Sequence, residues 1–167
     1  FAALTNEGPG KKPGRNFMKY SWPLLCALIA LSSLIFSWRA IKGEIAFFEL
    51  QDLCDYRLKT AEEFSKISPN EVEKALYRTV DLLPSSPFPW AAAADFMWMK
   101  RRPDLTLEYY KEALKRSPLR PSFYFRLYMF NKALGNRAEA AKDLQKAKEL
   151  FPNNPQYKNE SIPFKDL

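Results

Sequence analysis

The sequence predicts an all-α protein in which an N-terminal single transmembrane helix is followed by a short solenoid of helical hairpins. Three observations predict this fold. Residues 20–38 contain no charged side chain. Aromatic, alanine and proline residues recur 34 positions apart between residues 87 and 154. Prolines and capping residues delimit segments of helical length with apolar residues at helical spacing.

The composition argues against several functional classes. The chain has no histidine, which is the commonest general base and metal ligand. Cys26 and Cys54 lie too far apart to form a disulfide if the segment between them is helical. The net charge of +7 is spread along the chain, whereas nucleic-acid binding usually needs a clustered basic face. Since nucleotide-binding and catalytic motifs are also absent, we expect no enzyme activity, cofactor, metal, nucleic acid or small-molecule substrate.

A basic segment and an apolar segment open the chain. Residues 1–19 carry four basic side chains and one acidic one. Residues 20–38 would span roughly 28 Å as a helix, close to the hydrocarbon thickness of a bilayer. Tyr20 and Trp22 at one end and Trp38 at the other match the aromatic belts of membrane helices. We therefore expect these three residues to lie at the two surfaces of the lipid bilayer.

The charges that flank the apolar segment predict its orientation. Basic residues concentrate on the N-terminal side, so the positive-inside rule places the N-terminus in the cytoplasm and the repeats on the opposite, periplasm-like side. A cleaved signal peptide and a buried helix of a soluble domain are the alternatives for this segment. Because residue 1 is Phe, a processed precursor and a missing upstream segment both stay open.

Two successive blocks of 34 residues, 87–120 and 121–154, repeat one pattern. The matched pairs are Trp90 and Tyr124, Ala113 and Ala147, and Pro118 and Pro152. Small residues let two helices approach closely, and a proline ends the second helix because it cannot continue the hydrogen-bond ladder. The pattern therefore predicts two consecutive helical hairpins.

Each block resembles a tetratricopeptide repeat (TPR), and the whole chain resembles a membrane-anchored TPR-like protein. In that family the fourth position is a large aromatic, here Trp90 or Tyr124. The eighth is small, as Ala94 is, and the turn between the two helices contains a glycine, as Gly135 does. Arg101 replaces that glycine in the first block. The resemblance implies pairs of antiparallel helices stacked into a solenoid.

The remaining segments are assigned around the two blocks. Ser68 followed by Pro69 and Glu71 is a strong helix start, so we place the TPR-like domain at residues 68–154. Residues 39–67 are expected to form a juxtamembrane helix. Residues 155–167 contain two prolines and no helical periodicity, so we expect an extended C-terminal tail.

The resemblance also implies a binding surface, because the first helix of each repeat lines a concave face. The positions that it projects onto this groove are Phe88, Ala91, Asp95 and Trp98 in the first block and Phe125, Met129 and Lys132 in the second. Such an apolar, aromatic groove suits a peptide or a helix of a partner protein. The alternative is that the tail or the juxtamembrane helix of this chain fills the groove.

We expect a scaffold or assembly subunit that contacts other protein subunits through this groove and through its transmembrane helix, within a larger membrane complex. Two alternatives remain open. One is a membrane-tethered chaperone or receptor that binds client peptides. The other is the C-terminal part of a larger polytopic membrane enzyme.

Overall fold

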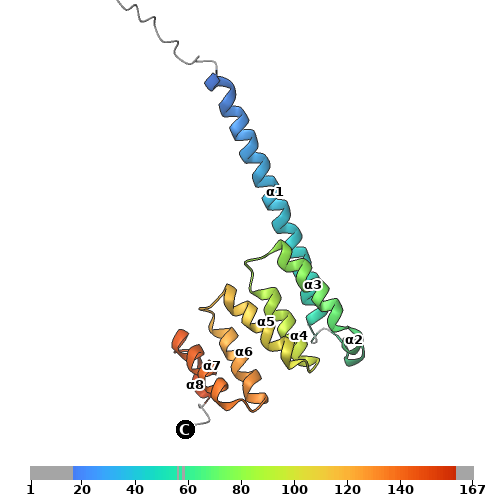
Figure 1. Ribbon diagram of the computed structural model, residues 1–167, viewed down its shortest axis with the longest axis vertical. Helices are drawn as coiled ribbons and strands as arrows, with labels where there is room; N and C mark the ends of the chain where they lie inside the picture. Colours follow the sequence, from blue (N-terminus) through green and yellow to red (C-terminus); the bar gives the residue numbers. More distant parts are fainter. Residues whose placement is uncertain (1–16, 56, 58, 161–167) are drawn as a thin grey trace, which may run out of the picture. The chain divides into compact units, whose positions relative to one another are not determined.

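The computed structural model describes residues 17–55, 57 and 59–160, and all of the regular structure in this part of the chain is helical (Figure 1). The helices are α1 (Phe17–Cys54), α2 (Ala61–Lys66), α3 (Pro69–Leu82), α4 (Phe88–Met99), α5 (Pro103–Arg116), α6 (Pro121–Ala133), α7 (Arg137–Leu150) and α8 (Pro155–Asn159). The chain divides into two compact units, one that ends at Arg39 and one that begins at Ala40. The predicted all-α class is confirmed.

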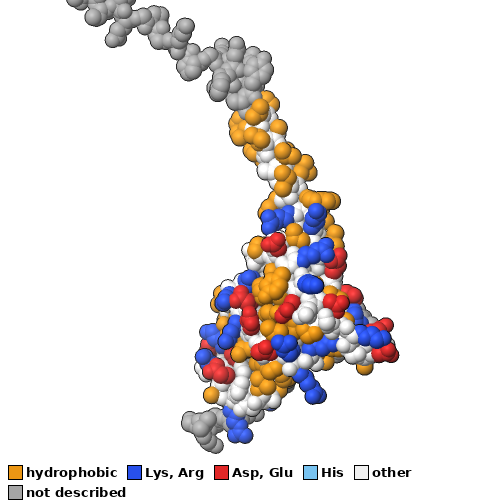
Figure 2. All heavy atoms as spheres, turned by 45° about the vertical axis from the view of Figure 1, so that its right-hand side comes forward, with side chains coloured by type: hydrophobic (Ala, Val, Ile, Leu, Met, Phe, Trp, Pro, Cys, Tyr) orange, Lys and Arg blue, Asp and Glu red, His pale blue; other side chains and the backbone are white. Residues whose placement is uncertain are grey.

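The first unit contains the N-terminal part of α1, which displays apolar side chains to its surroundings. Trp22 is 70% exposed and Trp38 is 61% exposed, and hydrophobic side chains cover the face of this part of α1 seen in Figure 2. The hydroxyls of Ser32 and Ser33 each donate to a helix carbonyl at 2.8 Å, which satisfies them without water. Within the described residues, α1 is long and apolar enough to cross a membrane.

The C-terminal part of α1 belongs to the second unit and packs on α3. Ala46 and Leu50 are buried, and the hydroxyl of Thr79 donates to the carbonyl of Ala46 at 3.1 Å. Gly43 lies on the same face, where a Cβ atom would come within 2.6 Å of the Leu83 side chain. The absence of a side chain at Gly43 therefore permits the close approach of these two segments.

The prediction of a single juxtamembrane helix over residues 39–67 is wrong. α1 continues unbroken to Cys54, and a separate short helix, α2, begins after Thr60. The Thr60 hydroxyl accepts from the Glu63 amide at 3.2 Å, and the Glu63 carboxylate accepts from the Thr60 amide at 2.8 Å. This capping box starts a new helix where a continuous one was expected. It also holds the pKa of Glu63 below its ordinary value through the hydrogen bond from the Thr60 backbone.

Helices α4 with α5 and α6 with α7 form the two antiparallel hairpins. Ala94 and Ala113 are fully buried where α4 meets α5, and the Trp90 ring packs on Tyr109 with ring centroids 5.7 Å apart. Thr106 replaces the alanine found in the second hairpin. Its buried hydroxyl donates to the Arg102 carbonyl at 2.8 Å, so a polar side chain is accommodated at this contact.

The two hairpin turns have the same backbone geometry although their residues differ. Arg101 has a φ of +57° and Gly135, 34 positions later, a φ of +76°. In each turn the next amide donates to a helix carbonyl at 2.9 Å, from Arg102 to Met97 and from Asn136 to Asn131. Arg101 thus adopts a left-handed conformation that favours glycine.

Replacing Arg101 with glycine is expected to raise the free energy of unfolding by about 1 kcal/mol, because it removes the steric cost of the left-handed conformation. Urea titrations of the full chain in detergent micelles measure the change. The matched control is Gly135→Ala. A Cβ atom at position 135 meets open space, so only the steric cost of the positive φ lowers the stability of this variant. A destabilised Arg101→Gly variant would contradict the assigned turn.

The prediction of an extended tail is wrong for its first part. Residues 155–159 form the short helix α8, which the Asn154 side chain caps by accepting from the Gln156 amide at 2.9 Å. Tyr157 is buried and packs on Phe125 with ring centroids 4.8 Å apart. A proline at the first helical position is compatible with a helix start. Residues 161–167 of the predicted tail lie outside the described residues.

A partly buried carboxyl group in α7 makes the stability of the second hairpin depend on pH. Burial raises the pKa of Asp143 from 3.8 to about 6, although its carboxylate accepts from the Asn131 side chain at 2.9 Å. The folded chain therefore holds this proton more tightly than the unfolded chain. The resulting stabilisation is complete below the unfolded pKa and is lost as the pH rises through the folded pKa.

The Asp143→Asn variant is expected to be more stable than the native chain by about 1 kcal/mol near pH 7.5, because the amide never ionises and still accepts from Asn131. The gain should disappear at about pH 4, where Asp143 binds its proton in the folded chain. Thermal unfolding at the two pH values measures both differences. Glu108→Gln, at an exposed position of α5 and away from Asp143, is the control. Equal gains at both pH values would contradict the burial of Asp143.

A candidate partner-binding cleft

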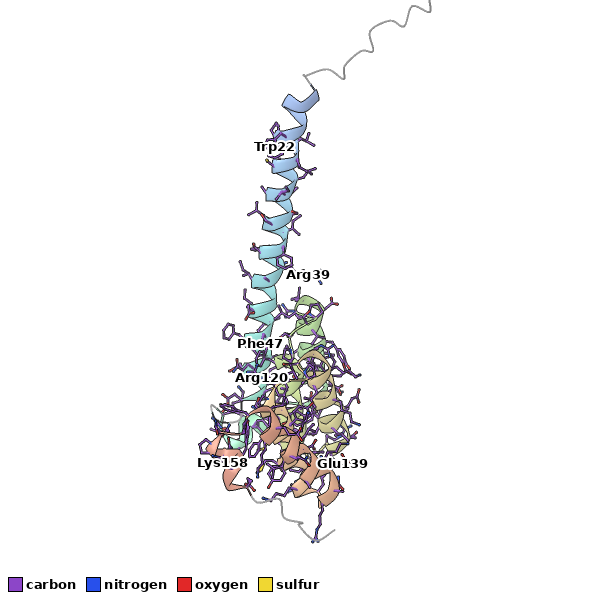
Figure 3. The ribbon with its side chains drawn as sticks, turned by 90° about the vertical axis from the view of Figure 1, so that its left-hand side faces the viewer. Trp22, Arg39, Phe47, Arg120, Glu139 and Lys158 are labelled. Atoms are coloured by element: carbon purple, nitrogen blue, oxygen red, sulfur yellow. The ribbon has the colours of Figure 1, made fainter. Side chains whose placement is uncertain are left out.

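A cleft of about 790 Å³ opens along the first helices of the two hairpins. α4 contributes one wall and α6 with its preceding loop contributes the other, while the last turns of α1 close one end through Phe47 and Gln51. Phe47 and Arg120, both labelled in Figure 3, come from segments far apart in the sequence and line this same cleft. All of its lining residues belong to the second unit.

Five of the seven residues that the sequence places in the groove line this cleft. They are Phe88, Ala91, Asp95, Trp98 and Met129. Phe88 is 42%, Trp98 36% and Met129 48% exposed, so three large apolar side chains face the opening. Phe88 packs against Phe123 and Trp98 against Phe130 in edge-on contacts, which fix the two rings to the walls. Ala91 is nearly fully buried and forms part of the floor.

The structure does not bring Phe125 and Lys132 into this cleft. Phe125 is buried beneath Tyr157 of α8 and lines a neighbouring cavity of about 600 Å³. The Lys132 amine contacts the Tyr128 hydroxyl at 2.9 Å and the Glu160 carboxylate at 3.0 Å. The start of the C-terminal segment therefore covers one end of the projected groove, as one of the alternatives anticipated, and no part of the tail that the structure describes, up to residue 160, lines the cleft itself.

Asp95, one of the two acids that line the cleft, is neutralised within the fold. The Asp95 carboxylate forms an ion pair with Arg126 across the cleft and accepts a hydrogen bond from the Tyr110 hydroxyl. Burial removes solvent from both groups, which lowers the pKa of the Arg126 guanidinium and raises the pKa of the Tyr110 phenol. The phenol therefore keeps its proton and donates it to Asp95 in the hydrogen bond. This network links α4, α5 and α6 and fixes the spacing of the two cleft walls.

Arg120 is a cleft residue that the sequence interpretation missed. Its guanidinium carbon lies 4.5 Å from the centre of the Phe88 ring and 5.6 Å from that of Phe123. In the part of the chain that the structure describes, Arg120 forms no ion pair. The residue precedes Pro121 in the connection between the hairpins, whereas the family pattern projects only helix positions onto the groove. Phe47 was missed because α1 lies outside the repeats.

Comparisons with known proteins identify the fold. No family model matches the sequence, and no curated protein matches it. The first TPR of Spaghetti (RPAP3), solved with an HSP90 peptide SRMEEVD, shares 18% identity with a TM-score of 0.55 over 72% of this chain and 89% of that chain. This chain has a TPR-like fold. The crystal structure of MamA matches over 53% of this TPR-like chain, at 16% identity and a TM-score of 0.47. The match spans about half (49%) of the length of the MamA chain.

Proposed function

We propose that this TPR-like chain is a membrane-anchored adaptor that holds another protein in the cleft between α4 and α6, as a subunit of a larger membrane complex. The observation that carries this proposal is the cleft that exposes the large apolar side chains Phe88, Trp98 and Met129 among polar and charged ones. Burying a large apolar side chain contributes about 1.5–3 kcal/mol, and these side chains are already partly buried, so each offers a partner a fraction of that amount.

The anchor is the part of α1 within residues 20–38. Its apolar side chains are exposed, as a lipid-facing helix requires, and its serine hydroxyls are satisfied by the helix backbone. Trp22 and Trp38 then lie at the two bilayer surfaces. The side chain of Tyr20, the third residue expected there, lies outside the described part of the chain. In this arrangement the N-terminus is cytoplasmic and the TPR-like domain is on the periplasm-like side.

Site-specific crosslinking in native membranes tests this function. A photoreactive amino acid at Met129, on the cleft, is expected to crosslink a defined partner protein. The same group at Lys111, an exposed position of α5 outside the cleft, should give no such product. The Trp98→Ala substitution should reduce the Met129 product at least about tenfold if this ring is an anchor of the interface.

The pattern of products separates the adaptor from its alternatives. A single product in constant yield supports a stable subunit, whereas many weak products would indicate a chaperone or receptor for client peptides. Products at Met129 and Lys111 in equal yield, or no product at either position, would contradict binding at the cleft. Membranes washed with alkaline carbonate should retain the chain, because an embedded helix does not dissociate under these conditions.

A further inference from the structure

The two arginines on the cleft wall formed by α6 and its preceding loop differ in their electrostatic environment. Arg126 is neutralised by Asp95. Arg120 has no acidic partner among the described residues, and its guanidinium lies against the faces of Phe88 and Phe123. Two aromatic rings thus hold an exposed cation at the edge of an apolar cleft and restrict its motion before any partner binds.

Resting on the proposed function, we propose that the partner presents a carboxylate flanked by apolar side chains, and that Arg120 binds this carboxylate. A guanidinium offers parallel N–H donors that match the two oxygens of an Asp or Glu side chain. The neighbouring apolar side chains of the partner would pack against the exposed rings of Phe88 and Trp98. Arg120 would then fix which part of the partner enters the cleft, and from which end.

The other charges of the cleft favour a protein carboxylate over a phosphate-rich ligand. Asp55, Arg57, Asp95 and Arg126 line the same cleft as Arg120, and Asp95 and Arg126 form an ion pair. The two acids and three arginines that line the cleft leave it with a formal charge of +1. A single carboxylate on an apolar segment balances this charge, whereas a polyanion exceeds it. The occupant that fits is therefore a mainly apolar protein segment with one acidic residue at the Arg120 end.

A peptide-display selection tests this inference. The full chain in lipid nanodiscs is used to select short random peptides, in parallel for the native chain, for Arg120→Glu and for the matched control Arg101→Glu. Arg101 is exposed and lies in the α4–α5 turn, outside the cleft. The native chain and Arg101→Glu should select peptides with an Asp or Glu next to Phe, Trp or Leu. Arg120→Glu should select Lys or Arg at that place.

Peptides selected by the native chain should lose at least about tenfold in affinity for Arg120→Glu and keep it for Arg101→Glu. Selected peptides without an acidic preference, or with equal affinity for both variants, would overturn the role of Arg120 and leave the cleft function standing. Inorganic tripolyphosphate that binds more tightly than the selected peptides would also overturn it. Failure of the native chain to select any peptide would remove both proposals.

Discussion

Replacing Gly43 with valine is expected to lower the free energy of unfolding of the TPR-like domain by about 2–3 kcal/mol, the usual cost of overpacking a tight contact. A Cβ atom at this position would come within 2.6 Å of the Leu83 side chain, and valine adds two methyl groups beyond it. The α1 segment must then move away from α3. That movement also weakens the hydrogen bond from Thr79 to the Ala46 carbonyl.

Urea titration of the full chain in micelles, followed by tryptophan fluorescence, measures this loss. Glu44→Val introduces the same side chain one residue later, at an exposed position of α1, and controls for the effect of valine on helix propensity. The double variant Gly43→Val with Leu83→Ala should recover part of the stability, because the smaller side chain opens space for the valine. Equal stability of Gly43→Val and Glu44→Val would show that α1 does not pack on α3 at this point.

Replacing Tyr157 with alanine is expected to destabilise the second hairpin by about 3 kcal/mol, as for other buried aromatic residues. Tyr157 is 4% exposed and packs on the Phe125 ring, which is itself buried. Terminal repeats of a solenoid need a cap over their last apolar face, and α8 supplies that cover here. The substitution would therefore expose Phe125 and loosen α6 and α7 more than α4 and α5.

Amide hydrogen exchange in the folded chain distinguishes a local effect of Tyr157→Ala from a global one. Faster exchange is expected in α6 and α7, with smaller changes in α4 and α5. Gln156→Ala, an exposed neighbour in the same short helix, should leave the exchange rates unchanged. Unchanged exchange in Tyr157→Ala would mean that α8 does not cover the end of the solenoid.

The repeat domain was predictable because its pattern is periodic. Residue types recur at a spacing of 34, and the matched prolines Pro118 and Pro152 lie just after the ends of α5 and α7 in the structure. The turn at Arg101 shows that the repeat predicts backbone conformation even where the residue type differs. Arg101 is left-handed like Gly135, although the glycine is absent from the first block. The short helices α2 and α8 have no such period. They depend on single capping side chains, Thr60 and Asn154.

The candidate site was predictable in the positions that belong to the repeat. The family pattern projects Phe88, Trp98 and Met129 onto a groove, and these three residues line one cleft in the structure. It could not show that α8 covers Phe125, because this contact involves a segment beyond the repeat. It also missed Arg120, whose place in the cleft depends on the path of a loop. The 34-residue pattern describes only the helices of the repeats, so it cannot predict their contacts with segments outside the pattern, such as α8.

Accessibility of the cleft in native membranes tests the central claim most directly. A cysteine at position 129 is labelled with a water-soluble maleimide in a Cys26→Ser background, and Lys111→Cys serves as the exposed control. The native Cys54 lines the same cleft, so the chain without the added cysteine supplies its background. That background should be small, because burial raises the pKa of Cys54 to about 12 and reactivity requires the thiolate. A partner in the cleft predicts that position 129 is protected in membranes and reacts after purification from other proteins, whereas position 111 reacts in both. Equal labelling of position 129 before and after purification would contradict an occupied cleft.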